Sequence, residues 1–137
     1  NEHFRAWQHL VLANMLVGDY SGIDEGTPDL EIDTNIPGSV TKKGGYLIRN
    51  VSYYSGKISG DAIEYGECAA NCATALLTGE RAYILDKKMD DGVADSGDLT
   101  AIRQGSGCVA NASTASASGA YTANDVVGCV LMYYFDD

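Results

Sequence analysis

The segment 4–17 most constrains the fold, because its residues favour a single helix with apolar side chains on two faces. Successive helical residues turn by about 100°, and this spacing produces two apolar stripes roughly 100° apart. A helix of this kind needs two packing partners. Gly18 is expected to end it as a left-handed C-cap. The first stripe holds Phe4, Trp7, Val11 and Met15, and the second holds Ala6, Leu10, Ala13 and Val17.

The start of this helix lacks a Ser, Thr or Asp N-cap and a Pro, so we expect it to be the C-terminal part of a longer helix. Two interpretations remain open. The helix is either central to a small globular core, or it packs on its own sheet with one stripe and on neighbouring subunits with the other. The second interpretation predicts an accessible face that includes His3, Phe4 or Trp7, together with some of Val11 and Asn14.

The composition favours one mixed domain over residues 1–137. Sixteen Gly and nine Tyr beside only two Pro and two Phe indicate strands and turns rather than a helical bundle. The net charge of −10 opposes binding to phosphate backbones and anionic headgroups, so no nucleic-acid partner is expected. The sequence contains no apolar run of about 18 residues, the length that spans a membrane.

The pattern along the chain predicts a long acidic loop over 19–45 and a short helix from an N-cap at Thr78 to Met89. The segment 105–125 is rich in Ser, Ala, Thr and Gly, and we expect it to stay outside the core. Strands are expected over 46–54, 58–65, 99–103 and 126–135, with a helical turn over 68–75, and the last strand is apolar enough to be buried on both faces.

Four cysteines form an even set that permits three pairings. Zinc binding is the competing interpretation, but Cys68 and Cys72 are spaced C-x3-C and Cys108 and Cys129 are far apart, unlike the two short pairs of a zinc knuckle. We predict the disulfides Cys68–Cys72 and Cys108–Cys129. The second would close a loop that has little else to hold it, with a stabilisation of about 3 kcal/mol. Disulfides imply an oxidising compartment.

An acidic segment with Gly92 at its centre is the one candidate metal site. Calcium takes six to eight hard oxygen ligands, which an acidic turn can supply. The spacing does not match an EF-hand loop, and a solvated turn that caps the preceding helix explains the same residues. Calcium is therefore a weak cofactor prediction, and the candidate ligands are Asp86, Asp90, Asp91, Asp95 and Asp98.

The sequence predicts no enzyme. His3 and His9 lie about 240° apart around the helix, so they cannot chelate one ion. Ser21 and Ser96 each precede a Gly, but neither lies in a G-x-S-x-G elbow, and turns explain both. No dinucleotide-binding or Walker sequence occurs.

Two blocks carry a family resemblance. The first runs from Phe4-Arg5-Ala6-Trp7-Gln8-His9-Leu10 through Leu12-Ala13 to the turn Gly18-Asp19-Tyr20-Ser21-Gly22. The second runs from Leu77 to Gly92 and is followed by Asp95-Ser96-Gly97. Both are similar to blocks of type IV pilins and type II secretion pseudopilins, and the two C-terminal cysteines resemble the disulfide-closed D-region of that family.

The resemblance implies an α+β fold in which an N-terminal spine helix packs on an antiparallel sheet of about four strands. Residues 1–18 would be the C-terminal half of the spine helix, and 19–45 the αβ-loop. Residues 46–104 would form the sheet with its short helix, and 105–137 a D-region-like segment with the last strand. The apolar N-terminal half of the spine helix would anchor the precursor in the inner membrane.

The function implied by the resemblance is structural. The chain would be a subunit of a pilus or pseudopilus used for adhesion, motility or secretion, at the cell surface or in the periplasm. Its partners would be further copies or other pilins. The rival hypothesis is a secreted, calcium-dependent binding or adhesin module that acts as a monomer. The residues expected at the subunit interface are Phe4, Trp7, Leu10, Val11 and Met15.

Overall fold

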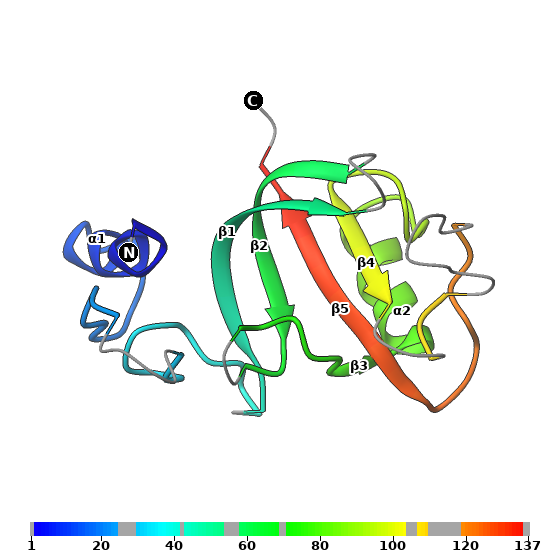
Figure 1. The fold of residues 1–137 in the computed structure, drawn as a ribbon, viewed down its shortest axis with the longest axis horizontal. Helices are drawn as coiled ribbons and strands as arrows, with labels where there is room; N and C mark the ends of the chain where they lie inside the picture. The colour runs from blue at the N-terminus through cyan, green and yellow to red at the C-terminus, as the bar shows by residue number, and fades with distance from the viewer. Residues whose placement is uncertain are drawn as a thin grey trace.

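The computed structural model shows an α+β fold with two helices and one antiparallel sheet of five strands (Figure 1). It describes residues 2–24, 30–41, 43–53, 58–68, 71–103, 107–109 and 119–135. The elements in chain order are α1 (Glu2–Leu12), β1 (Gly45–Tyr53), β2 (Ile58–Gly66), β3 (Leu77–Thr78), α2 (Gly79–Met89), β4 (Leu99–Arg103) and β5 (Val127–Tyr134).

Strand β5 is the centre of the sheet. Strands β2 and β3 pair with successive parts of one edge of β5, β4 pairs with the other edge, and β1 pairs with β2. Residues 128–132 of β5 are all buried, as expected for an apolar strand covered on both faces. The sheet has five strands, whereas about four were expected. The prediction missed β3, because its two residues are too few to leave a pattern in the sequence.

The two faces of the sheet carry different cores. Leu47, Glu64 and Met132 are neighbours across β1, β2 and β5, on the same face as a cluster of buried side chains that includes Val51 and Val130. The opposite face carries α2, as Figure 1 shows behind β4 and β5. Ala82 of α2 packs there against Leu99, Ala101, Cys129 and Leu131.

Helix α2 begins where its sequence predicted. The Thr78 hydroxyl accepts a hydrogen bond from the backbone N–H of Arg81 at 3.3 Å, so Thr78 is the N-cap. Gly79 follows it in a tight space, because a Cβ there would lie 2.4 Å from the carbonyl oxygen of Thr122. The predicted end at Met89 is confirmed as well.

Helix α1 is shorter than predicted. It ends at Leu12 rather than Val17, and Asn14, with φ of 57°, takes the left-handed conformation that we expected of Gly18. The N–H of Asn14 bonds to the carbonyl of Val11 and the N–H of Met15 to that of Leu10, both at 2.9 Å. These two bonds form a Schellman C-cap, for which Asn is the usual substitute for Gly.

The loop predictions need three corrections. Residues 71–75 form no helical turn; the chain there bends, and Thr74 instead makes a β-bridge with Glu67. The 19–45 segment is not only a surface loop, because Leu30 and Ile36 are buried against α1. The 105–125 segment is not wholly outside the core, because Cys108 and Val109 are buried. Residues 110–118 and Tyr54 lie outside the described residues.

Candidate functional site

Three of the five predicted metal ligands come together at the C-terminal end of α2. One carboxylate oxygen from each of Asp86, Asp90 and Asp91 lies within 4.8 Å of the others. Asp95 and Asp98 do not join this group among the described residues. The helix brings Asp86 and Asp90 together because residues four apart lie on one face.

These carboxylates already accept hydrogen bonds from the turn that follows α2. Asp86 accepts from the N–H of Gly92 at 2.9 Å, and Asp90 accepts from the N–H of Leu99 at 2.9 Å. Asp91 accepts from the N–H of Val93 at 2.7 Å. The acidic residues therefore hold the 90–99 turn in place, which supports the capping interpretation.

Asp86 is completely buried and lies under Tyr121, whose hydroxyl donates to Oδ2 of Asp86 at 2.5 Å. Burial raises the pKa of this carboxyl. The hydrogen bonds from Tyr121 and Gly92 oppose that rise, and the negative charges of Asp91 and Asp90 add to it. The burial of this side chain could not be foreseen, because Tyr121 is 35 residues away.

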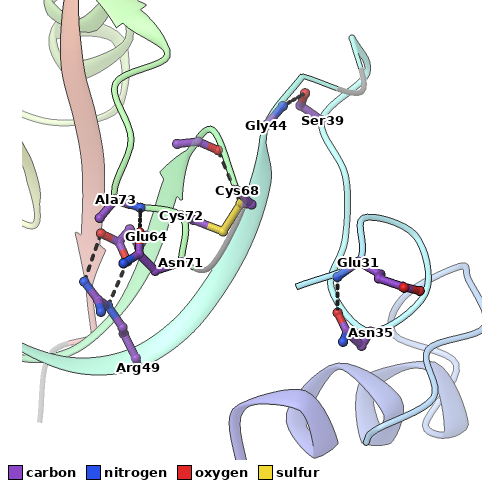
Figure 2. The surroundings of a disulfide bond; sticks show 11 residues. Glu31, Asn35, Ser39, Gly44, Arg49, Glu64, Cys68, Asn71, Cys72 and Ala73 are labelled. Carbon is purple, nitrogen blue, oxygen red and sulfur yellow. Dashed lines mark hydrogen bonds and ion pairs between the residues drawn. A yellow bond between two sulfur atoms is a disulfide. The ribbon is translucent and has the colours of Figure 1, made fainter. Parts of the chain in front are cut away.

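Both predicted disulfides are present. Cys68 pairs with Cys72, and Cys108 pairs with Cys129. All four cysteines of the chain are used, so none is left to bind zinc. The first bridge closes a short bend after β2 (Figure 2), and the second ties the 107–109 segment to the central strand β5.

A buried ion pair in the sheet was missed by the sequence analysis. Nε of Arg49 lies 2.7 Å from Oε2 of Glu64, and Nη2 of Arg49 donates to Oε1 at 3.1 Å (Figure 2). Glu64 is completely buried, whereas the Arg49 side chain is 32% exposed. The signal available in the sequence was a Glu between Ile63 and Tyr65 in a strand.

The predicted interface residues divide into three groups by burial. Phe4 and Trp7 are buried in their own chain and His3 is half-buried, so the accessible face predicted to hold His3, Phe4 or Trp7 contains neither Phe4 nor Trp7. They pack beside β1 and the 30–36 segment, which cover these two side chains. Leu10 and Val11 are half-buried against the same cluster, and Met15 is exposed.

Three apolar side chains protrude around the end of α1. Leu12 is 73% exposed, Met15 75% and Val17 96%, and we call these three residues the apolar tip. Asn14 is exposed beside them, as predicted, whereas His3 is half-buried. The tip differs from the predicted face because the chain turns at Asn14 instead of continuing as a helix.

An apolar groove lies on the sheet face that carries α2, and we call it the sheet groove. Its volume is about 480 Å³. The rings of Tyr46 and Tyr65 stack in its wall with centroids 4.8 Å apart. Burial, and to a lesser degree the neighbouring Tyr65, raises the pKa of the Tyr46 hydroxyl. Its lining also includes Ile63, Leu85, Met89 and Tyr133.

The chain matches no known protein-family model, no curated protein and no solved structure. The resemblance to type IV pilins therefore stays a prediction, as do the expectations on partners, location and the absence of catalysis. Among the described residues, no helix is long and apolar enough to cross a membrane.

Proposed function

We propose that this chain is the globular domain of a filament subunit of the type IV pilin or pseudopilin class. The observation that carries the proposal is the state of the N-terminal helix. Phe4 and Trp7 attach it to its own β1, while the three side chains of the apolar tip at its C-terminal end are 73% to 96% exposed. Apolar side chains that are exposed together are typical of a surface that binds another protein.

The arrangement of the chain supports the same proposal. An N-terminal helix, a long connecting segment, an antiparallel sheet and a disulfide near the C-terminus follow one another in the order implied by the resemblance. The two disulfides favour the periplasm or the cell surface. In this proposal an apolar upstream half of the helix anchors the precursor in the inner membrane, and the assembled filament serves adhesion, motility or secretion.

Filament formation in cells tests the proposal. The gene is expressed from its own start codon in its native host, and surface filaments are sought by electron microscopy with an antibody against this domain. We expect labelled filaments and a membrane-bound precursor. Secretion of intact monomers made without an upstream apolar segment would overturn the proposal.

A calcium-dependent binding module is the second candidate function. The proximity of Asp86, Asp90 and Asp91 favours it, since hard oxygens within 4.8 Å can share one calcium ion. Their hydrogen bonds to the backbone of the turn favour a structural role instead. Calcium titration separates the two.

A further inference from the structure

We propose that the sheet groove of one copy receives the apolar tip of a second copy, so that subunits associate head to tail. This inference rests on the proposed filament function and deepens it, because it names the two surfaces of the globular domain that meet. Both surfaces are on the same chain, and they are different from each other.

The sheet groove is suited to an apolar insert. Leu85 and Met89 of α2 stand one helical turn apart and form one wall, and Tyr46, Tyr65 and Tyr133 contribute from the sheet. Met89 is largely exposed in the single chain. Covering this surface would remove apolar area from water, which is the main driving force for association.

The apolar tip is suited to enter a groove. The Schellman cap at Asn14 turns the chain away from the helix axis, so that Leu16 packs back on the core while Met15 and Val17 point outward. Met15 is unbranched and flexible, which allows it to adapt to an aromatic-lined groove. The tip is thus a compact protrusion held by backbone hydrogen bonds.

Charged residues flank both surfaces: two cations lie along α2 beside the groove, the acidic Asp90 and Asp91 lie beyond its C-terminal end, and one anion lies beside the tip. Arg81 and Lys88 lie four residues before and three residues after Leu85, which places both along the groove side of α2, and both are exposed. Asp19 is exposed two residues after Val17. With a net charge of −10, two copies repel each other in most orientations. Pairing of Asp19 with Arg81 or Lys88 favours the orientation that brings the tip to the groove.

The geometry predicts an open assembly. Helix α1 and helix α2 lie toward opposite ends of the long axis of the molecule (Figure 1). Tyr46 and Ile63 of the groove also pack against the cluster around α1, but the tip residues are not part of the groove lining, so one copy can give its tip to one neighbour and its groove to another. A contact between two different surfaces propagates into a filament or a ring, whereas a contact of one surface with itself stops at a dimer.

The three methionines provide a direct test, because one lies in each surface and Met132 is buried in the core as an internal reference. The domain is labelled with ¹³C at the methionine methyl groups, and NMR spectra are recorded as its concentration rises to roughly 1 mM, the range of weak contacts. We expect the Met15 and Met89 signals to shift together while Met132 stays constant. Shifts of only one of the two, or of neither, would overturn the inference.

Two variants then distinguish head-to-tail contact from other associations. Met15→Glu disables the tip and Met89→Glu disables the groove, and both side chains are exposed, so the fold is preserved. Each variant alone should lose the concentration dependence. A mixture should form a dimer by sedimentation velocity, since one intact tip and one intact groove remain. A mixture that stays monomeric would refute the pairing. Val40→Glu, at a fully exposed site apart from both surfaces, is the matched control and should associate like the parent chain.

Charge exchange provides a further readout. Asp19→Lys should weaken the contact, and combining it with Arg81→Glu and Lys88→Glu should restore it. The outcome is independent of the filament assay. Filaments that assemble normally from Met15→Glu subunits would overturn this contact and leave the proposed function intact. Tip-to-groove contact in solution without filaments in cells would support the contact and overturn the proposed function.

Discussion

The Arg49–Glu64 pair provides the sharpest test of how the sheet is held together. Replacing Arg49 with Met keeps a long apolar stem and removes the guanidinium that contacts both oxygens of Glu64, at 2.7 and 3.1 Å. In the parent chain this carboxylate is completely buried, with Leu47 and Met132 beside it on the neighbouring strands. Losing one partner of a buried pair costs about 3–5 kcal/mol.

The expected cost lies at the lower end of that range. Arg49 is 32% exposed, so water can reach part of the space that its head group leaves. We expect Arg49→Met to lower the free energy of unfolding by about 3 kcal/mol. At a urea dependence of about 1–3 kcal/mol per molar, this loss shifts the unfolding midpoint down by roughly 1–3 M.

Two further variants control the measurement. The double variant Arg49→Met with Glu64→Leu should recover most of the loss, because apolar side chains replace both charges. Arg5→Met removes the exposed pair with Glu2, at 3.7 Å, and should cost less than about 1 kcal/mol. An Arg49→Met cost as small as that of Arg5→Met, or no recovery in the double variant, would refute this account of the pair.

Three other predictions concern the disulfide and the acidic turn. Replacing Cys108 and Cys129 with Ala opens a loop with a sequence separation of 21, and should cost about 3 kcal/mol in urea unfolding, more than replacing the pair with a separation of 4. The pKa of Asp86 is raised in the folded state, so this carboxyl stabilises the fold fully below the ordinary carboxyl range, and the stabilisation is lost as pH rises. The variant Asp86→Asn should not show this loss of stability in thermal melts between about pH 4 and 7. If the acidic turn binds calcium, millimolar Ca²⁺ should raise the melting temperature relative to chelator, and equal melting temperatures would leave only the capping role.

Features that depend on neighbours along the chain were predictable. Thr78 was predicted as an N-cap because Thr is a preferred residue before a helical pattern, and its hydroxyl accepts a hydrogen bond from the N–H three residues later. The apolar run at 127–134 identified the central strand, since burial on both faces removes the usual alternation. The even count of cysteines favoured disulfides, and the low-complexity loop that a Cys108–Cys129 bridge would close favoured the pairing that is present.

Features that depend on contacts across the chain were decided only by tertiary structure. Asn14 and Gly18 could both take a left-handed conformation, and the chain turns at Asn14, where Leu16 can pack on the core. Periodicity marked two stripes on the N-terminal segment but could not say that Phe4 and Trp7 of the first stripe would be buried while Met15 would be exposed. Three of the five acidic residues converge where α2 ends, since Asp90 caps the helix one turn after Asp86 and Asp91 follows, and Tyr121 closes over Asp86. Local patterns determine which elements form, while long-range packing determines which of their surfaces stay open to a partner.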